Sequence, residues 1–290
     1  MFKNVTNKQI SRVIIIIKSL LVVILAYKLW EASRAGYQLV IDSEFFIFLI
    51  VGFIAEIVDG SLGMAYGVIC SSFLIFFGIP PSVASAGVHT SEVFTTGVSG
   101  LSHLHFKNVD KSLFFRLVIP GVIGSLAGAY VLSKLIEGDV IKPFISLYML
   151  FIGIRLIIRQ WQGNKQHIKP MRAIPLIGLA GGALDAIGGG GWGPLVTSTI
   201  LSREGADAKH TIGTVNTAEF FITFASTGIF LFLIGITSFK IILGLIIGGV
   251  VAAPLGAYVV KQVSHKVLMY VVGAVLVLIS AISIGGYFMQ

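Results

Sequence analysis

Charged side chains are scarce in this chain. They make up 12% of its 290 residues, whereas 56% of the residues are hydrophobic. The surface of a water-soluble domain needs charged side chains at roughly a quarter to a third of its positions, so this composition excludes a soluble protein. Apolar runs of about 18 or more residues fit membrane-spanning helices, since the strands of a membrane barrel need only about ten alternating residues. The sequence therefore predicts an all-α integral membrane protein surrounded by the lipid bilayer.

Cysteine is almost absent. The only one, Cys70, lies inside an apolar run, which excludes a disulfide framework and a thiolate metal site. We interpret Cys70 as a packing residue. The net charge of +8 does not indicate a nucleic-acid partner, because the Lys and Arg residues lie mostly in short loops between apolar runs, where they set the orientation in the membrane. We expect neither a cofactor nor a metal ion, and the oligomeric state, including a homo-oligomer, stays open.

A glycine-rich stretch at 178–193, GLAGGALDAIGGGGWG, has a weaker copy 126 positions earlier. The matching pairs are Asp59 with Asp185, Gly63 with Gly189, Tyr66 with Trp192 and Gly67 with Gly193. Further pairs follow at separations of 127 and 128, namely Thr90 with Thr217, Glu92 with Glu219, Phe94 with Phe221, Ser99 with Ser226, and Gly128-Ala129-Tyr130 with Gly256-Ala257-Tyr258. So small a drift over the whole unit indicates an internal duplication.

The duplication predicts how the chain is divided. We expect a first transporter repeat at 45–160, a cytoplasmic linker at 161–172 and a second transporter repeat at 173–290. Residues 1–44 precede them as an N-terminal anchor helix with an external link.

Each repeat interrupts a helix at membrane depth. The apolar run 45–58 has 14 residues, which at ~1.5 Å per residue is shorter than the ~30 Å hydrocarbon core, so it cannot span alone. We expect a break at 59–67 and a resumed helix to about 78, and in the second copy helices at 173–187 and 190–202. Full spans are expected at about 13–30, 83–104, 113–132, 143–158, 211–234, 239–260 and 267–287. Interrupted helices at corresponding positions of two halves indicate the substrate site of a transporter.

The charges of the loops distinguish two topologies. The stretch 155–172, taken as a loop, contains five basic residues and no acid, which is typical of a cytoplasmic loop. It would lie outside if each broken pair of helices crossed the membrane once, and inside if each pair returned to its own side. We therefore predict about seven transmembrane helices and two re-entrant hairpins that enter from opposite faces in two inverted repeats and meet near the midplane. The N-terminus is then cytoplasmic and the C-terminus outside.

Ionisable residues at membrane depth cost roughly 2.5 to 3.5 kcal/mol each on insertion scales and therefore indicate function. None of the deep positions in the two repeats is expected to carry Lys or Arg, so we expect an anionic substrate to be held by helix N-termini, free backbone N–H groups and hydroxyls. The candidate substrate-binding residues are Asp59, Gly60, Ser61, Gly63, Tyr66, His89, Thr90, Ser91, Asp185, Gly188, Gly189, Gly190, Gly191, Trp192, Asn216 and Thr217. In this set the glycines offer N–H groups, the hydroxyl and amide side chains donate hydrogen bonds, and Tyr66 and Trp192 wall the pocket.

Some of these polar residues have a second interpretation. Asp59 and Asp185 either take part in transport or cap the second half-helix of each broken pair. Glu92 and Glu219 either couple the substrate to proton flow or are buried acids bonded to the facing hairpin. His89 either forms a hydrogen bond or relays protons.

Two other functional classes compete with a secondary transporter. Gly97-Val98-Ser99-Gly100 matches the G-x-S-G motif of rhomboid intramembrane proteases, but the second half offers no suitably placed deep histidine. A passive anion channel is the closer competitor, and dependence of the flux on a proton gradient would separate it from a coupled transporter.

The two Asp-Gly/Ala-x-x-Gly-x-x-aromatic-Gly breaks, the later GGGGWGPL, the paired segments 89–92 and 216–219, and the two Gly-Ala-Tyr motifs resemble the TauE/SafE family of sulfite exporters. The likeness covers roughly residues 45–287. It implies secondary transport of a small sulfur-containing anion, such as sulfite, sulfoacetate or another organosulfonate, across a bacterial cytoplasmic membrane. We expect alternating access with proton coupling and no enzymatic activity.

Overall fold

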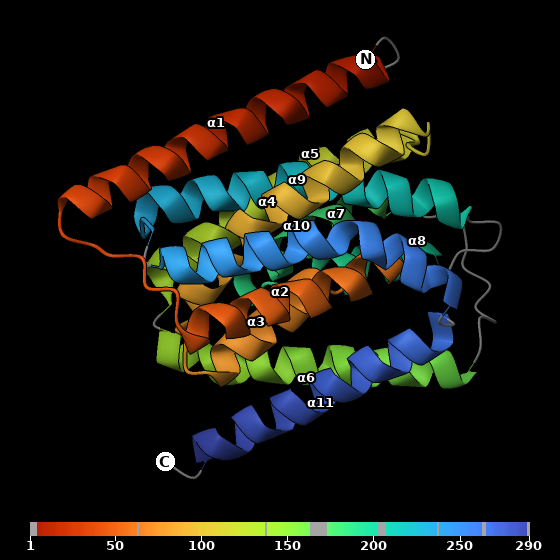
Figure 1. Ribbon diagram of the computed structural model, residues 1–290. Coiled ribbons are helices and arrows are strands. Elements are labelled where there is room, and N and C mark those ends of the chain that lie inside the picture. Colours follow the sequence, from red (N-terminus) through yellow and green to blue (C-terminus); the bar gives the residue numbers. More distant parts are fainter. Residues whose placement is uncertain are drawn as a thin grey trace.

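The computed structural model is a bundle of long helices joined by short loops (Figure 1). It describes residues 5–62, 64–136, 138–162, 173–201, 207–236, 238–262 and 265–288. The elements are α1 (Asn7–Arg34), α2 (Ser43–Leu62), α3 (Tyr66–Phe76), α4 (Pro81–His105), α5 (Lys111–Tyr130), η1 (Val131–Leu135), α6 (Gly138–Gln162), α7 (Ile174–Gly188), η2 (Trp192–Thr197), α8 (Ser198–Leu201), α9 (Ala208–Leu233), α10 (Phe239–Gln262) and α11 (His265–Phe288). Every regular element in these ranges is helical, and the all-α prediction is confirmed.

Seven long helices, α1, α4, α5, α6, α9, α10 and α11, run between the two ends of the bundle (Figure 1). They have between 20 and 28 residues, which at ~1.5 Å per residue is enough to cross a hydrocarbon core of ~30 Å. Among the described residues, the segments Asn7–Arg34, Lys111–Leu135 and Lys209–Leu233 are both long and apolar enough to cross a membrane.

The remaining helices form two hairpins. The first, α2 with α3, starts and finishes at the end of the bundle where α1 ends and α4 begins (Figure 1). The second, α7 with η2 and α8, starts and finishes at the opposite end, where α9 begins (Figure 1). Hence the two hairpins enter the bundle from opposite ends.

Several predicted boundaries are wrong in detail. The helix expected to stop at Val58 continues to Leu62, so α2 has 20 residues and is no shorter than a span. Glycine permits a break without enforcing one, so the helix can continue through Gly60. The helix expected to end at Ile158 continues to Gln162, because the apolar pattern continues through Arg159. After the second break the chain resumes as a π-helix, η2, before the short α8.

The helix pairing has a two-fold pattern. Helix α2 packs on α10, and α7, its counterpart in the second half, packs on α5, the counterpart of α10. Two further pairs, α4 with α9 and α6 with α11, join counterparts directly. This exchange is the pattern expected of inverted repeats, whereas the domain boundaries at 45–160 and 173–290 stay predictions.

The exchanged pairs are held by close backbone contacts at glycines. On the α5–α7 side Gly124 faces the Leu179 carbonyl, and on the α2–α10 side Gly248 faces the Leu49 carbonyl. Neither site has space for a Cβ atom. Small residues of this kind let membrane helices approach closely enough for their backbones to pack.

Helix α1 covers one side of the bundle and packs mainly on α4 (Figure 1). Its inward residues, such as Ile14 and Leu21, are buried, whereas Ile15, Ile16 and Leu20 between them are apolar and exposed. The Lys18 ammonium donates a hydrogen bond of 3.4 Å to the Phe94 carbonyl, and its stem lies over Gly97. A lysine in an apolar helix thus has a partner inside the bundle.

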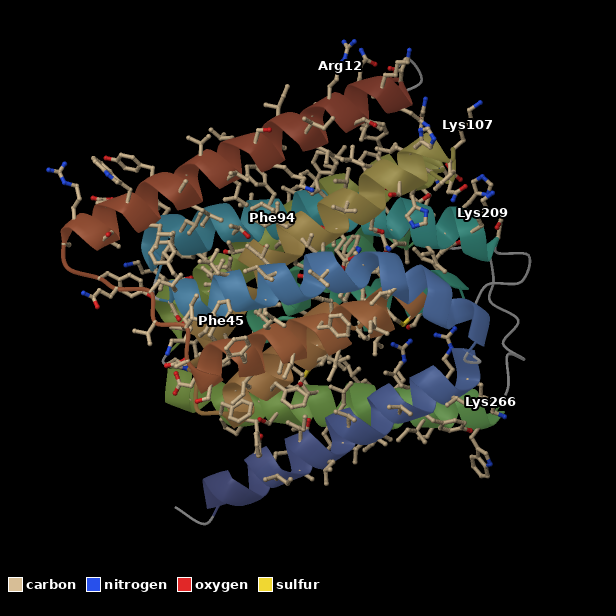
Figure 2. The ribbon with its side chains drawn as sticks, in the orientation of Figure 1. Arg12, Phe45, Phe94, Lys107, Lys209 and Lys266 are labelled. Carbon is tan, nitrogen blue, oxygen red and sulfur yellow. The ribbon has the colours of Figure 1, made fainter. Side chains whose placement is uncertain are left out.

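Basic side chains gather at one end of the molecule. Arg12, Lys107, Lys209 and Lys266 lie toward this end, away from Phe45 (Figure 2). At the other end Lys240 of α10 forms ion pairs of 2.8 Å and 3.0 Å with Asp42 and Glu44. The hydrogen bond from Lys240 lowers the pKa of Asp42 below its usual value.

We expect Gly124→Ala to destabilise the protein, because the new Cβ would overlap the Leu179 carbonyl oxygen. Overpacking of this kind costs about 1–3 kcal/mol, which should lower the midpoint of thermal unfolding in detergent. The matched control is Gly228→Ala in α9, where a Cβ would meet nothing within 4 Å and the unfolding midpoint should not fall. Equal midpoints for the two variants would contradict the close packing of α5 on α7.

The positive-inside rule predicts that the basic end faces the cytoplasm. A thiol introduced as Lys107→Cys should react with a membrane-impermeant maleimide only when the cytoplasmic face is accessible, and one introduced as Glu44→Cys only from outside. The background is Cys70→Ser, although Cys70 itself is buried. Reaction of both thiols from the same face would contradict the topology.

Candidate functional site

The tips of the two hairpins touch inside the bundle. The Ser71 hydroxyl of α3 donates a hydrogen bond of 3.3 Å to the Gly189 carbonyl, and Gly67 lies directly against Gly189. Gly189 has a positive φ of 67°, which favours glycine, and a side chain there would collide with the Ser71 hydroxyl. The two breaks therefore meet, as the repeat predicts.

Asp185 closes the second break. Its Oδ1 accepts hydrogen bonds from the backbone N–H groups of Gly191 and Trp192, at 2.8 Å and 3.0 Å. These are N–H groups at the start of η2 that have no partner of their own within a helix. Of the two interpretations left open for this residue, capping describes the observed geometry.

Asp59 occupies the corresponding place in the first break. Its Oδ1 accepts a hydrogen bond of 3.3 Å from the backbone N–H of Tyr66, the first residue of α3. The two repeats thus use the same device, in which the aspartate near the end of the first helix caps the start of the next one.

The aromatic residues that follow the two breaks fix the tips to the long helices. The Tyr66 hydroxyl lies 3.2 Å from both Ser91 Oγ on α4 and the Leu245 carbonyl on α10. The Trp192 indole N–H donates to the Val215 carbonyl on α9 at 3.2 Å. Both side chains are fully buried, so they lie in the core rather than at the edge of an open pocket.

The hydrogen-bond donors predicted for an anion are largely engaged within the protein. The hydroxyls of Thr90 and Thr217 donate to the carbonyls of Ala86 and Gly213, four residues earlier in their helices, at 2.7 Å and 2.6 Å. The Gly189 N–H donates to the Asp185 carbonyl, in addition to the two N–H groups that Asp185 caps. The expectation that these groups are free is wrong for the observed conformation, because each of them bonds to an acceptor within its own helix or hairpin.

Five further predicted residues extend this network or lie outside the described part of the chain. The Ser91 hydroxyl donates to the Val88 carbonyl at 2.7 Å, and the Asn216 amide donates to Ser99 Oγ at 3.1 Å. Ser99, the serine of the protease-like motif, thus has an amide neighbour in place of the histidine that a protease requires. The surroundings of Gly60, the side chain of Ser61 and the whole of Gly63 lie outside the described residues.

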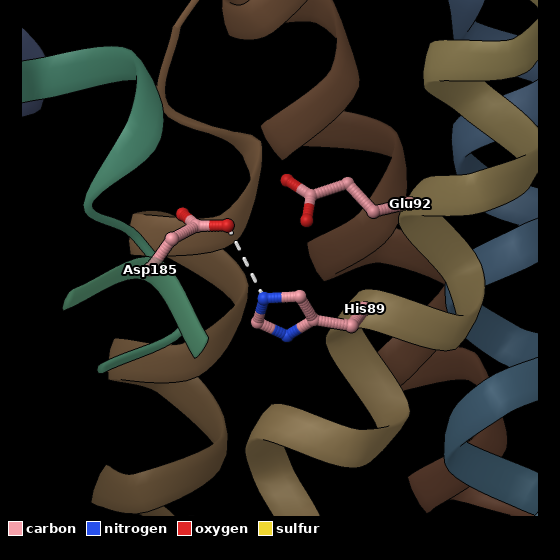
Figure 3. A group of neighbouring side chains, drawn as sticks. All are labelled: His89, Glu92 and Asp185. Carbon is pink, nitrogen blue, oxygen red and sulfur yellow. Dashed lines mark hydrogen bonds and ion pairs between the residues drawn. The ribbon is translucent and has the colours of Figure 1, made fainter. Parts of the chain in front are cut away.

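His89 connects α4 to the second hairpin (Figure 3). Its Nδ1 lies 2.8 Å from the Ser85 carbonyl, which can only accept, so Nδ1 carries a proton. Its Nε2 lies 3.2 Å from Asp185 Oδ2. His89 therefore donates a hydrogen bond to Ser85 within its own helix, and its Nε2 faces the aspartate that caps η2.

Acidic side chains dominate the interior around the tips. Glu56, Asp59, Glu92, Asp185 and Glu219 are all buried. Glu92 forms a hydrogen bond with the backbone of Gly67, which joins it to the first hairpin while His89 joins the same helix to the second. Glu219 lies within electrostatic range of Glu92, Asp59 and Asp185.

One basic residue was missed at this depth. Arg155 of α6 donates to the Pro194 carbonyl of η2 at 3.1 Å and to Thr199 Oγ1 of α8 at 3.4 Å. It holds the returning arm of the second hairpin from the side. The signal in the sequence was the apolar pattern that continues from Arg155 to Arg159, since a helix that runs on places Arg155 inside the bundle.

The comparisons with known proteins agree on one family. A family model described as sulfite exporter TauE/SafE matches residues 48–283, which leaves α1 outside the matched region. The probable membrane transporter protein YtnM of Bacillus subtilis (strain 168) is 44% identical over 244 residues, 81% of this chain and 81% of that protein. The probable membrane transporter protein YunE of the same organism is 27% identical over 124 residues, 40% of this chain and 45% of that protein. No solved structure matches.

Two substitutions at Asp185 distinguish the contribution of its hydrogen-bond acceptor to the cap on η2 from the contribution of its charge. Asp185→Ala should lower the free energy of unfolding by about 0.5–2 kcal/mol, the usual value of an N-cap. Asp185→Asn should retain most of the stability, because its amide oxygen can still accept from Gly191 and Trp192. Thermal unfolding in detergent would measure both variants, and an alanine variant as stable as the asparagine variant would show that the cap contributes nothing.

Proposed function

The chain belongs to the sulfite exporter TauE/SafE family and is a membrane transporter, and we propose that it moves small sulfur-containing anions by alternating access, coupled to protons. The substrate class includes sulfite, sulfoacetate and related organosulfonates. We place it in a bacterial cytoplasmic membrane, with the basic end of the bundle and the N-terminus in the cytoplasm.

The contact of the two hairpin tips is the observation that carries this proposal. Each hairpin enters from its own end of the bundle, and the tips meet at Gly67 and Gly189. A site at such a contact can be reached from either end if one half of the protein rocks against the other. The contact includes the backbones of Gly67 and Gly189, the Ser71 hydrogen bond and the Val68 side chain, which lies against Gly190.

The chemistry at the tips suits an oxyanion. When the tips separate, backbone N–H groups and the hydroxyls of Thr90 and Thr217 become available to an incoming anion. The bonds that these hydroxyls give up run to carbonyls in the same helices, and such local bonds exchange at small cost. Asp59 and Asp185 remain as caps that hold the broken ends in place, and Tyr66 and Trp192 hold the tips to the long helices.

Proton coupling is assigned first to Glu219. This acid is buried in α9 and has four other buried acids within electrostatic range, so a proton stabilises it in the membrane interior. Its counterpart Glu92 was predicted to share this role. Glu92, however, lies next to His89 and Asp185, and Glu219 does not belong to this cluster of three side chains. The proton role of Glu92 stays a prediction.

We expect Glu219→Gln to abolish gradient-driven uptake or efflux while leaving membrane insertion intact, because glutamine keeps the shape of the side chain and cannot carry a dissociable proton. Flux would be measured in proteoliposomes with sulfite, thiosulfate, sulfoacetate and taurine as the panel, with and without an imposed pH gradient. The proton gradient should accelerate flux of at least one of the anions in the unmodified protein at least about tenfold, which corresponds to a decrease of roughly 1.4 kcal/mol in the barrier to transport.

The matched control is Glu31→Gln, the same substitution at an exposed acid near the end of α1, which should transport normally. Proton coupling would be contradicted if flux were saturable in the unmodified protein and in the Glu219→Gln variant but did not depend on the pH gradient in either. Flux that is neither saturable nor gradient-dependent would indicate the passive channel. Absence of flux for every anion in the panel would contradict the substrate class.

A further inference from the structure

Three ligand-type side chains converge at the junction of α4 and the second hairpin (Figure 3). One donor atom each from His89, Glu92 and Asp185 lie within 4.8 Å of one another. The three residues are 0%, 3% and 2% exposed. They come from two elements, α4 and α7, that belong to different halves of the chain.

The hydrogen bonds around His89 leave a lone pair facing a carboxylate. Because Nδ1 donates to the Ser85 carbonyl, the neutral ring presents Nε2 as an acceptor. The group opposite, Asp185 Oδ2, is also an acceptor, and it lies 3.2 Å away. Two acceptors at this distance attract each other only if a positive particle, a proton or a metal ion, lies between them.

Glu92 supplies the observation that favours a metal ion over a single proton. Its Oε2 atom is buried and has no hydrogen-bond partner in the part of the chain that the structure describes. One proton shared by His89 and Asp185 would leave this carboxylate oxygen unpaired in the membrane interior, which is costly. A divalent ion bound by all three groups would satisfy it and would also neutralise both carboxylates.

The orientation of each donor is that of a supported metal site. A histidine that binds a metal through one nitrogen usually donates its other N–H to a carbonyl or carboxylate, as His89 does to Ser85. Asp185 is oriented in the same way, because its Oδ1 accepts from two backbone N–H groups and its Oδ2 is turned toward the site. Bonds of about 2.0–2.2 Å from a tetrahedral metal place neighbouring donors about 3.3–3.6 Å apart, close to the 3.2 Å between His89 and Asp185.

The repeat provides an internal comparison. The counterparts of His89, Glu92 and Asp185 in the other half are Asn216, Glu219 and Asp59. An amide nitrogen has no lone pair for a metal, and Asn216 is bonded to Ser99. Only one of the two symmetric positions therefore has an imidazole ligand.

We propose that His89, Glu92 and Asp185 bind one divalent transition-metal ion, of the class that accepts imidazole and carboxylate ligands, such as zinc, cobalt or manganese. The ion joins α4 to the second hairpin and keeps coordination positions for water or another small ligand. Its binding does not depend on which anion the transporter carries.

The test uses the full-length protein, purified in detergent without a histidine tag and treated with a chelator. Titration with Co²⁺, followed by visible absorption and calorimetry, should give one ion per chain that Zn²⁺ displaces. Loss of an outer partner of a metal ligand already weakens binding by 10- to 100-fold, so His89→Gln and Glu92→Gln should weaken it by about 100-fold or more. Bound Co²⁺ should also raise the thermal unfolding midpoint of the unmodified protein but not of these variants.

The matched controls are Asp59→Asn and Asn216→Ala, the counterparts in the other half, which should bind Co²⁺ as the unmodified protein does. Both ligand variants are compared by size-exclusion profile and by unfolding midpoint without metal, so that a folding defect in one leaves the other as the test. Failure of the unmodified protein to bind Co²⁺, Mn²⁺ or Zn²⁺ would overturn the proposal and leave a proton between His89 and Asp185. Binding that survives in both ligand variants would also overturn it, because it would arise at surface groups such as the exposed pair of Asp207 and His210.

Discussion

The close contact between the two hairpin tips is the constraint on which the rest of the structure depends. Two turns with broken backbone hydrogen bonds meet where no lipid or bulk water can satisfy them. Glycines allow the approach, since Gly67 and Gly189 have no space for a side chain. The aspartates near the ends of α2 and α7 then accept hydrogen bonds from backbone N–H groups that have no partner within a helix because of the breaks. A hairpin tip in a membrane protein thus needs glycines, which allow the close approach, and polar side chains, which accept the unpaired backbone N–H hydrogen bonds.

The tips also concentrate negative charge. The side chains that cap the two breaks are both aspartates, and they lie next to three buried glutamates. The basic groups at depth do not balance them directly, because Lys18 and Arg155 are bonded to backbone carbonyls and, in the case of Arg155, also to the Thr199 hydroxyl. Protons or a metal ion would reduce the negative charge of this site and so favour the approach of an anion. The proposed proton coupling and the proposed metal site would both act in this way.

The sequence was sufficient for the parts of the fold that depend on composition and repetition. Hydrophobic runs predicted the helices, the duplicated Asp and Gly positions predicted the two breaks, and the loop charges predicted hairpins that return to their own ends. It was insufficient where tertiary packing decides. Helix α2 continues past Asp59 to Leu62, and α6 continues past Ile158 to Gln162, although neither extension was predicted. That the N–H groups at the second tip are occupied follows from the distance between Asp185 and η2, which no local pattern contains.

Packing also explains why the duplicated halves are no longer equivalent. Glu56 has Gly182 as its counterpart, and a Cβ at Gly182 would collide with the Gly121 carbonyl of α5. The α5–α7 contact is thus too close for an acid at this position. On the other side the counterpart of Gly121 is Gly249, which faces the Thr95 methyl group, and Glu56 has room to form a hydrogen bond with Thr95. With His89 present in one half and Asn216 in the other, a symmetric scaffold holds two chemically different sites.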